Sequence, residues 1–476
     1  MKFIAASNSA WEKRISIAMD ALSRITELEE KLNDFSASVR AQALAELVIL
    51  ARQGDVSVVS ETELINLHCH TFYSYNAYGY SPTYIAWLAK KNGYRFMGIV
   101  DFDVLDGADE FLYACEVLGI RGSAGMETRV YIPEFGDTEI NSPGEPGIAY
   151  HMGIGFTSST TPVDAAQALK QIRQCTTLRN LEIIRRLNDY LAPLSIDYQK
   201  DVLPLTPNGN ATERHMVITL IQKAQQTIPQ LVAFWTEKLN QPKEKIAQTI
   251  RDESGFQNLV RSKLMKRGGV GYIQPTMDTF PTVEEFHRVV EECQALPCAA
   301  WLDGTSAGEQ RIEELLGLLV EKGVVALNII PDRNWNINDP QIKKVKVNNL
   351  FQVVELANRI DLFINVGTEM NSPGQKLMDD FTTAELAPLH DYFMRSAYFI
   401  YGHTRMQSVL GKGYQSQWAK KYLPTRYERN EFFTQMGKLI APDAQSKALL
   451  AQLDTTAAPN MIIEQFKKII IKGSNK

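Results

Sequence analysis

The stretch Asn66-Leu67-His68-Cys69-His70 ends an apolar run in a His-x-His pair, directly before a turn rich in Tyr, Asn and Gly. Side chains two residues apart on a strand share a face, so the rings of His68 and His70 point toward one place. Neutral imidazole is a good ligand for zinc, manganese or iron. The pair therefore indicates a metal site, and two structural histidines at a strand end are the alternative. Cys69 faces the other way and is expected to be a packed thiol.

A strand, helix and strand unit surrounds this pair. Residues 81–93 have a helical pattern that a Ser-Pro pair opens, and residues 95–101 read as a short buried strand. That strand ends in Asp101 and Asp103, and Glu127 follows another apolar run. Carboxylates thus collect at strand ends, where barrels of alternating strands and helices build their chemistry.

The chain after residue 290 repeats this alternation of apolar strands and helices. Such spacing is the βα pattern of a parallel barrel. We predict strands at 295–302, 324–330 and 362–366 and helices at 308–322 and 353–359.

These ordered motifs resemble the PHP (polymerase and histidinol phosphatase) domain family, whose members are metal-dependent phosphoesterases and related hydrolases on a distorted seven-stranded β/α barrel. The resemblance covers about residues 62–156 and, more weakly, 290–372. It rests on ordered motifs. They include His68-Cys69-His70-Thr71, similar to the first family motif; Val100-Asp101-Phe102-Asp103, where the family has Thr-Asp-His-Asp; Tyr150-His151-Met152-Gly153; and Gly367-Thr368-Glu369-Met370-Asn371, similar to Gly-Ser-Asp-x-His.

The resemblance implies one complete metal site and one incomplete site. The residues that match the ligands of the first metal are His68, His70, Glu127 and Glu369. A second metal would share Glu127 and use His151, but Trp301 stands near the position of its other histidine. Asp303, two residues later, is the substitute ligand that we consider for this site.

A third metal site is expected to be absent. Phe102 and Asn371 stand where the resemblance would require histidines, and Asn76 falls near its remaining ligand. A phenyl ring cannot ligate, and carboxamides bind transition metals weakly compared with imidazole. The prediction is one or two divalent metals per chain, of zinc, manganese or iron.

The activity that the resemblance implies is metal-dependent hydrolysis, most simply of a small phosphorylated metabolite, with a metal-bound hydroxide as the nucleophile. Asp101 and Asp103 are the predicted catalytic carboxylates, which would orient the ligands or accept a proton. A phosphodiester or a non-phosphate bond stays open because the missing third site helps to hold phosphate in trinuclear relatives. The alternative is a catalytically inactive protein that binds a metal or a ligand.

An anionic substrate needs cationic partners, and four residues are predicted to contact it. Arg214 and His215 begin a helix in a long helical insertion, and helix starts favour negative charge. Arg333 and Asn371 follow the strands at 324–330 and 362–366, on the same rim as Glu369. Guanidinium binds phosphate in a bidentate way, and Arg214 and His215 are the stronger candidates because they lie at the start of their helix. A solvated helix face is the alternative for the helix arginines, and an ordinary polar loop after a strand is the alternative for Arg333.

Composition limits the partners. The net charge is -5, and no run of Lys or Arg interleaved with aromatic residues is present, so nucleic acid is an unfavoured partner. Five cysteines in no zinc-ribbon spacing suit a reducing compartment. No segment approaches the roughly 18 apolar residues of a membrane span, and the N-terminus lacks a signal-peptide pattern. We expect a soluble cytoplasmic protein with a small-molecule substrate, and homo-oligomer formation is left open.

Three regions are predicted: a helical N-terminal extension at 1–60, a PHP-like β/α barrel at 61–376 with the helical insertion at about 162–267, and a helical C-terminal region at 377–476. In the N-terminal extension, apolar residues recur at steps of three and four, which is typical of an amphipathic helix. This helix either packs on its own barrel or forms a coiled-coil dimerisation arm. The residues of the pattern are Trp11, Ile15, Ala18, Leu22, Ile25, Leu28 and Leu32.

Overall fold

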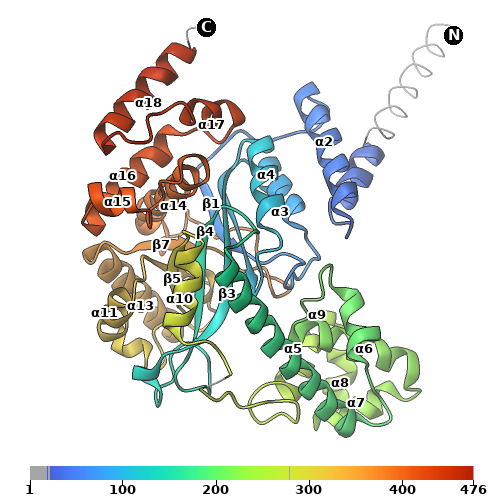
Figure 1. Ribbon diagram of the computed structural model, residues 1–476. Coiled ribbons are helices and arrows are strands. Elements are labelled where there is room, and N and C mark those ends of the chain that lie inside the picture. The colour runs from blue at the N-terminus through green and yellow to red at the C-terminus, as the bar shows by residue number, and fades with distance from the viewer. Residues whose placement is uncertain (1–18, 20–21, 278, 475–476) are drawn as a thin grey trace, which may run out of the picture.

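Seven strands form one curved sheet in chain order (Figure 1). The structure is a computed structural model that describes residues 19, 22–277 and 279–474. Strand β4 runs antiparallel to both neighbours, and every other neighbouring pair is parallel. The strands are β1 (Leu64–Cys69), β2 (Tyr94–Phe102), β3 (Arg121–Tyr131), β4 (Ile148–Phe156), β5 (Leu296–Trp301), β6 (Ala326–Ile329) and β7 (Phe363–Val366).

A parallel bridge between Cys69 and Glu369 joins the end of β1 to the loop after β7. The sheet is thereby nearly closed into a barrel, and the predicted α/β barrel with helical regions is confirmed. The strands carry apolar side chains on both faces, as expected for a sheet that is covered on the outside and filled on the inside.

Helices cover the outside of the barrel and follow the strands as expected from the alternating pattern. One helix is longer than predicted: α13 begins at Pro340, because Asp339 caps it by accepting hydrogen bonds from two backbone N–H groups of its first turn. The covering helices are α3 (Pro82–Lys91), α4 (Ala108–Leu118), α10 (Val283–Glu292), α11 (Ile312–Glu321), α13 (Pro340–Arg359) and α14 (His390–Leu410). The short helix α12 (Asp332–Trp335) follows β6 directly, at the barrel mouth.

The insertion between β4 and β5 is helical and has an apolar core of its own around Trp235 and Phe256. Its first helix, α5, runs from the barrel to the rest of the insertion, at the lower right of Figure 1. The helices are α5 (Val163–Leu191), α6 (Glu213–Thr227), α7 (Leu231–Leu239), α8 (Lys243–Thr249) and α9 (Glu253–Leu264).

The described part of the N-terminal region packs on its own barrel. Residues 22–31 are helical, and Leu28 and Leu32 are buried in one apolar cluster with residues of α2 (Ala37–Gln53), α3 and α4. Trp11, Ile15 and Ala18, which begin the predicted pattern, lie outside the described residues.

The C-terminal helices follow α14. They are α15 (Gln417–Tyr422), α16 (Arg426–Leu439), α17 (Ala444–Leu450) and α18 (Pro459–Ser474). Two of them, α16 and α17, contact α14 directly. Helices α14 and α16 cross closely at Gly402 and Gly437, where an added Cβ would collide with the backbone of the other helix. None of the helices in the described ranges combines the length and the apolar character that crossing a bilayer requires.

Candidate metal centre

Three buried side chains from two strands converge at the carboxyl end of β1. His68 lies in β1, His70 follows its last residue, and Glu127 comes from β3. Oε2 of Glu127 lies 3.3 Å from Nε2 of His70 and 4.0 Å from Nε2 of His68, and the three potential ligand atoms lie within 4.8 Å of one another. Neither Nε2 has a hydrogen-bond partner in the described part of the chain. Buried polar atoms are nearly always paired, so this arrangement fits a bound cation.

The second nitrogen of each imidazole is held by a neutral group. Nδ1 of His68 lies 3.1 Å from Oδ1 of Asn328, which can only accept, so Nδ1 carries the proton. Nδ1 of His70 lies 3.1 Å from the Ser74 hydroxyl, which itself donates to Asp101 and therefore accepts from the ring. Each Nε2 is left with a lone pair. Such a fixed second nitrogen is typical of metal-binding histidines and sets the ring orientation.

The pKa values of the two rings shift in opposite directions. Burial lowers the pKa of His68 below its ordinary value. Burial also acts against the charged form of His70, but the adjacent Glu127 carboxylate raises its pKa above the ordinary value. Imidazole binds a metal in its neutral form, so a cation at this place would compete with protonation of His70.

Glu369 reaches the edge of this cluster from the loop after β7. Its N–H donates to the carbonyl of His68 and its carbonyl accepts from the N–H of His70, both at 2.7 Å. Gly367 permits this approach, because a Cβ there would collide with the backbone of His68. Oε2 of Glu369 pairs with Arg333 at 2.5 Å. Burial opposes the charge, but Arg333 and then the two histidines lower the pKa of Glu369 to about 2. Its assignment as a ligand stays a prediction.

Asp101 lies behind the cluster and holds the turn that follows His70. Its carboxylate accepts hydrogen bonds from the Thr71 N–H at 2.7 Å, the Thr71 hydroxyl at 2.6 Å and the Ser74 hydroxyl at 2.7 Å. Burial raises the pKa of Asp101, and these hydrogen bonds act in the opposite direction. Asp101 is therefore placed to position His70 through Ser74.

His151 lies on the opposite face of the barrel wall from Glu127. In the β3–β4 pair Glu127 is opposite Met152, whereas Thr128 is opposite His151. Directly paired residues share a face and successive residues alternate. Nε2 of His151 lies 2.6 Å from Nε2 of His287, on the covering helix α10. The structure does not bring His151 to the cluster, and its prediction as a ligand of a second metal is not supported.

Asp303 is also separate from the cluster. Its Oδ2 pairs with Lys346 of α13 at 2.8 Å, and its Oδ1 accepts the Thr305 N–H at 3.0 Å. Burial opposes the charge, but the hydrogen bond and charge of Lys346 lower the pKa of Asp303. Trp301 is 3% exposed and lies on the outer face of the barrel wall, because it is two residues after Ala299, which pairs with outward-facing His151. The predicted substitution of Asp303 for the missing ligand is therefore not supported.

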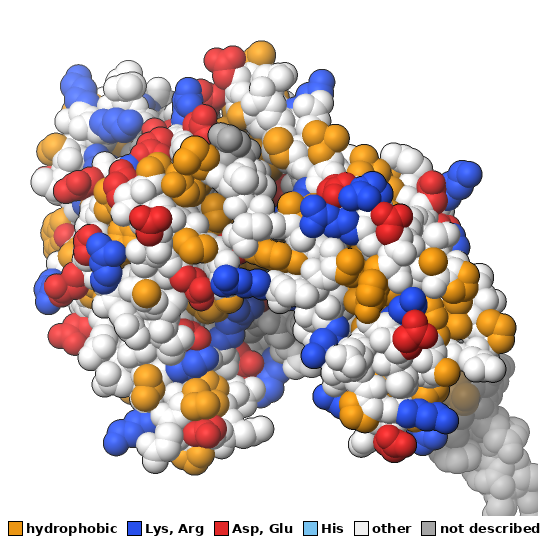
Figure 2. All heavy atoms as spheres, turned by 90° about the horizontal axis from the view of Figure 1, so that it is seen from below, with side chains coloured by type: hydrophobic (Ala, Val, Ile, Leu, Met, Phe, Trp, Pro, Cys, Tyr) orange, Lys and Arg blue, Asp and Glu red, His pale blue; other side chains and the backbone are white. Residues whose placement is uncertain are grey.

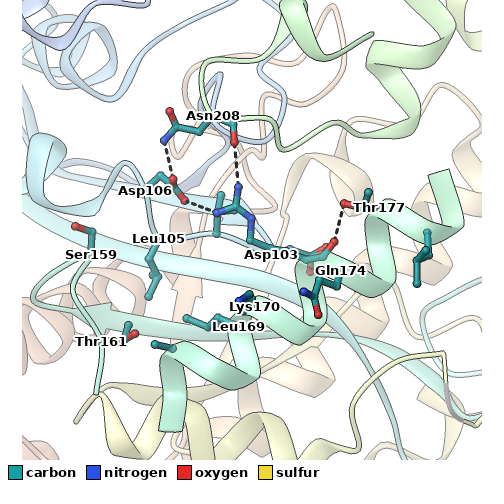
Figure 3. A pocket seen from close by; sticks show the side chains of 14 residues that line it. Asp103, Leu105, Asp106, Ser159, Thr161, Leu169, Lys170, Gln174, Thr177 and Asn208 are labelled. Carbon is teal, nitrogen blue, oxygen red and sulfur yellow. Dashed lines mark hydrogen bonds and ion pairs between the residues drawn. The ribbon is translucent and has the colours of Figure 1, made fainter. Parts of the chain in front are cut away.

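Asp103 points toward α5, outside the strand barrel. It accepts hydrogen bonds from Thr128 at 2.6 Å and Thr176 at 3.0 Å, and burial raises its pKa to about 6. It lines a pocket of about 860 Å³ beside α5, across which the amide of Asn208 donates to Asp106 at 2.6 Å (Figure 3). This pocket is distinct from the His–Glu cluster, so a catalytic role for Asp103 in that cluster is not supported.

The four predicted substrate contacts have different surroundings. Nδ1 of His215 accepts the Thr212 N–H at 3.0 Å and thus caps α6, and burial lowers the pKa of His215 to about 4. Arg214 is buried and bridges Asn258 and Ser372. Arg333 pairs with Glu369 yet stays 40% exposed. Asn371 is half-buried next to Ser372. The arginines and Asn371 thus lie at the rim, whereas His215 has a structural role.

Two residues of this site were not predicted from the sequence. Asn328 is a buried amide within the apolar strand β6, and this unusual setting was the available signal. Tyr150 shares the inner face with Glu127, since residues 150 and 152 alternate with His151. Burial raises the pKa of Tyr150, so its phenol keeps its proton at neutral pH and stays a hydrogen-bond donor.

Comparison with known proteins gives weak structural similarities. No protein-family model and no curated protein matches the chain. An amidohydrolase from Chromobacterium violaceum, determined with bound sulfate and no metal, aligns with a TM-score of 0.46 and 16% identity, over 65% of this chain and 88% of that chain. A protein from Bifidobacterium adolescentis, provisionally described as a metal-dependent phosphoesterase, aligns with a TM-score of 0.44 and 19% identity, over 68% and 95%. Neither similarity assigns the chain to a family.

Proposed function

We propose that this protein is a metal-dependent hydrolase whose centre holds one divalent cation between His68, His70 and Glu127. The observation that carries the proposal is the pair of buried Nε2 atoms, without hydrogen-bond partners among the described residues, beside one carboxylate. Leaving such atoms unpaired costs free energy. Both rings are also oriented by a hydrogen bond on Nδ1, as metal-binding histidines are.

A single metal fits the residues better than two. A second cation would need ligands besides Glu127, and the candidates His151 and Asp303 are engaged by His287 and Lys346. Imidazole and carboxylate ligands suit zinc, manganese and iron alike.

The reaction that we propose is hydrolysis of a phosphoric ester of a small metabolite. A divalent cation would supply a Lewis acid that activates water and polarises the bond under attack. Arg333, exposed at the rim, is placed to bind oxygen atoms of the substrate, and the protonated Tyr150 can donate a hydrogen bond to them. The motifs that resemble the PHP family and the arginines at this rim support the phosphoester over other bonds.

The test compares wild type with two carboxylate-to-carboxamide variants. Glu127→Gln removes the proposed ligand, whereas Asp303→Asn changes a carboxylate that is held by Lys346 and serves as the matched control. Metal content is measured by elemental analysis after reconstitution with zinc, manganese or iron, and hydrolysis is measured with an aryl phosphate monoester and a diester. About one metal per chain, lost with activity in Glu127→Gln and kept in Asp303→Asn, supports the proposal.

Two results would contradict it. If the wild-type protein takes up no metal, the proposed metal centre does not exist. A protein that binds one metal at Glu127 but hydrolyses neither ester would favour the alternative of a protein that binds a metal or a ligand without turnover.

A further inference from the structure

Five basic residues lie near one another where the barrel mouth faces the insertion, as shown by the charge interactions among them and with Glu213 and Tyr150. Figure 2 shows Lys and Arg side chains along the hollow between these two parts of the molecule. The set, called here the basic cluster, combines side chains from the barrel and from the insertion. Its members are Arg129 in β3, Arg333 in α12, Arg214 in α6, Arg261 in α9 and Lys266 after α9.

Three carboxylates are paired with four members of the basic cluster. Glu145 pairs with Arg129 at 2.8 Å, and Glu369 pairs with Arg333 at 2.5 Å. Glu213 is shared by Arg261 at 3.0 Å and Lys266 at 2.8 Å. Positive charge therefore exceeds the negative charge that is paired with it.

Arg214 is the member without a counter-ion. It is 7% exposed, and its guanidinium donates to Oδ1 of Asn258 at 2.7 Å and to the Ser372 hydroxyl, both of which are neutral. No ion pair of Arg214 is present among the described residues. Burial and then the charge of Arg261 lower its pKa to about 10, although the carboxylate of Glu213, which pairs with Arg261 and Lys266, acts in the opposite direction; Arg214 therefore remains charged at neutral pH. A buried charge without a partner is costly, and an anion at this place would remove that cost.

Arg214 is linked to the loop that carries Glu369. Ser372, its hydrogen-bond partner, donates its N–H to the side chain of Gln375 at 2.8 Å, and Gln375 lies 3.4 Å from Oε2 of Glu369. Arg333 binds that same Oε2. Two guanidinium groups, one from the insertion and one from the barrel, therefore flank one short loop beside the candidate metal centre.

We propose that Arg214 and Arg333 form a subsite for a terminal oxyanion, and that the insertion thereby supplies half of the specificity of the site. The ligand group is a carboxylate or a phosphate, because both offer two oxygen atoms to a guanidinium. The use of this subsite for a substrate rests on the proposed hydrolase function. Binding of the anion itself depends only on the chain's own cations and needs no metal.

The test measures anion binding to metal-free protein in the presence of a chelator. Inorganic phosphate and malonate are titrated separately by calorimetry, which distinguishes a phosphate subsite from a carboxylate subsite. The variants are Arg214→Met and Arg214→Lys. The control is Arg185→Met, on α5 of the same insertion, whose side chain is 61% exposed and paired with Glu182 and Asp189.

We expect at least a tenfold weaker binding of the preferred anion in Arg214→Met, partial recovery in Arg214→Lys and no change in Arg185→Met. Without the anion, the melting temperature of Arg214→Met should equal or exceed that of wild type, because an unpaired buried cation is removed. A structural role alone predicts the opposite: a lower melting temperature and unchanged anion affinity.

The inference is overturned if metal-free wild type binds neither anion more tightly than Arg214→Met does. This outcome is independent of the hydrolase proposal. If the protein takes up no metal but loses anion binding in Arg214→Met, the subsite is supported and the hydrolase proposal is rejected. If the protein is a metal-dependent hydrolase whose anion affinity does not depend on Arg214, the hydrolase is supported and the subsite is rejected.

Discussion

The ring of His151 is held by His287. Nδ1 of His287 lies 2.7 Å from the carbonyl of Lys322, so it carries the proton and donates. Nε2 of His287 is then an acceptor, and Nε2–H of His151 donates to it across 2.6 Å. Burial keeps the pKa values of both rings low. The pair is a neutral hydrogen bond that ties β4 to α10.

His151→Ala should therefore lower stability without changing metal content. The substitution leaves a buried acceptor on His287 unpaired, which costs about 1–3 kcal/mol. We expect a lower midpoint of chemical unfolding and about one metal per chain by elemental analysis. His70→Ala is the contrasting variant, which should lose the metal. Loss of metal in His151→Ala at unchanged stability would contradict this assignment.

We expect Asn328 to strengthen metal binding by orienting the ring of His68. Asn328→Leu removes the acceptor for Nδ1, so the ring is no longer held with its lone pair toward Glu127. Loss of such a partner typically weakens metal binding by about 10–100-fold. Asn328→Asp keeps an acceptor and should retain affinity. A competition titration of zinc against a chromophoric chelator measures both variants, and equal affinities in the two would show that the hydrogen bond has no role.

Variants of Arg333 and Glu369 would show whether Glu369 is a metal ligand. Their ion pair engages Oε2 of Glu369, so a guanidinium competes with a cation for this carboxylate. If Glu369 ligates, Arg333→Met should bind zinc more tightly than wild type and Glu369→Gln more weakly. The same competition titration decides the matter. Unchanged affinity in both variants would limit Glu369 to its role as the partner of Arg333.

Asp379 should make stability depend on pH. It is 2% exposed, its Oδ2 has no hydrogen-bond partner among the described residues, and burial raises its pKa to about 7. In the unfolded chain the pKa is near its ordinary value of about 3.9. Between these values only the folded protein binds the proton, so this group lowers stability as pH rises through the window, by about 1.4 kcal/mol per unit.

Asp379→Asn should remove this dependence. Its melting temperature should exceed that of wild type at pH 8, and the difference should shrink toward pH 4. Asp380→Asn is the control, because Asp380 is exposed and its pKa is lowered by hydrogen bonds from Thr382. A difference between Asp379→Asn and wild type that is the same at both pH values would contradict the prediction.

The sequence revealed the local parts of the site and of the fold. The His-x-His spacing placed two rings on one face, because strand alternation depends only on the chain itself. The alternation of apolar strands and helices likewise predicted the barrel. Cys69 is buried on the opposite face, as expected, with its thiol near Asn66.

The sequence did not reveal the tertiary relationships. The register of β4 against β3 places Tyr150 on the inner face and His151 on the outer face. Asp303 is engaged by Lys346, a residue of a helix whose orientation no local pattern specifies. Asp103, just after β2, has its partner Thr176 on the distant helix α5. Each of these differences concerns a direction or a distant partner, which residue spacing does not encode.

The bridge between Cys69 and Glu369 places the candidate centre beside the junction of the first and last strands of the barrel. His68 and His70 belong to the first strand region and Glu369 follows the last, so the cluster lies beside the seam where the two ends of the sheet meet. A cation that Glu369 shared with the two histidines would oppose separation of these ends. Ligand release and loosening of the seam become one coupled event, and the earliest amides to exchange with solvent in the empty protein should be those of β1 and β7.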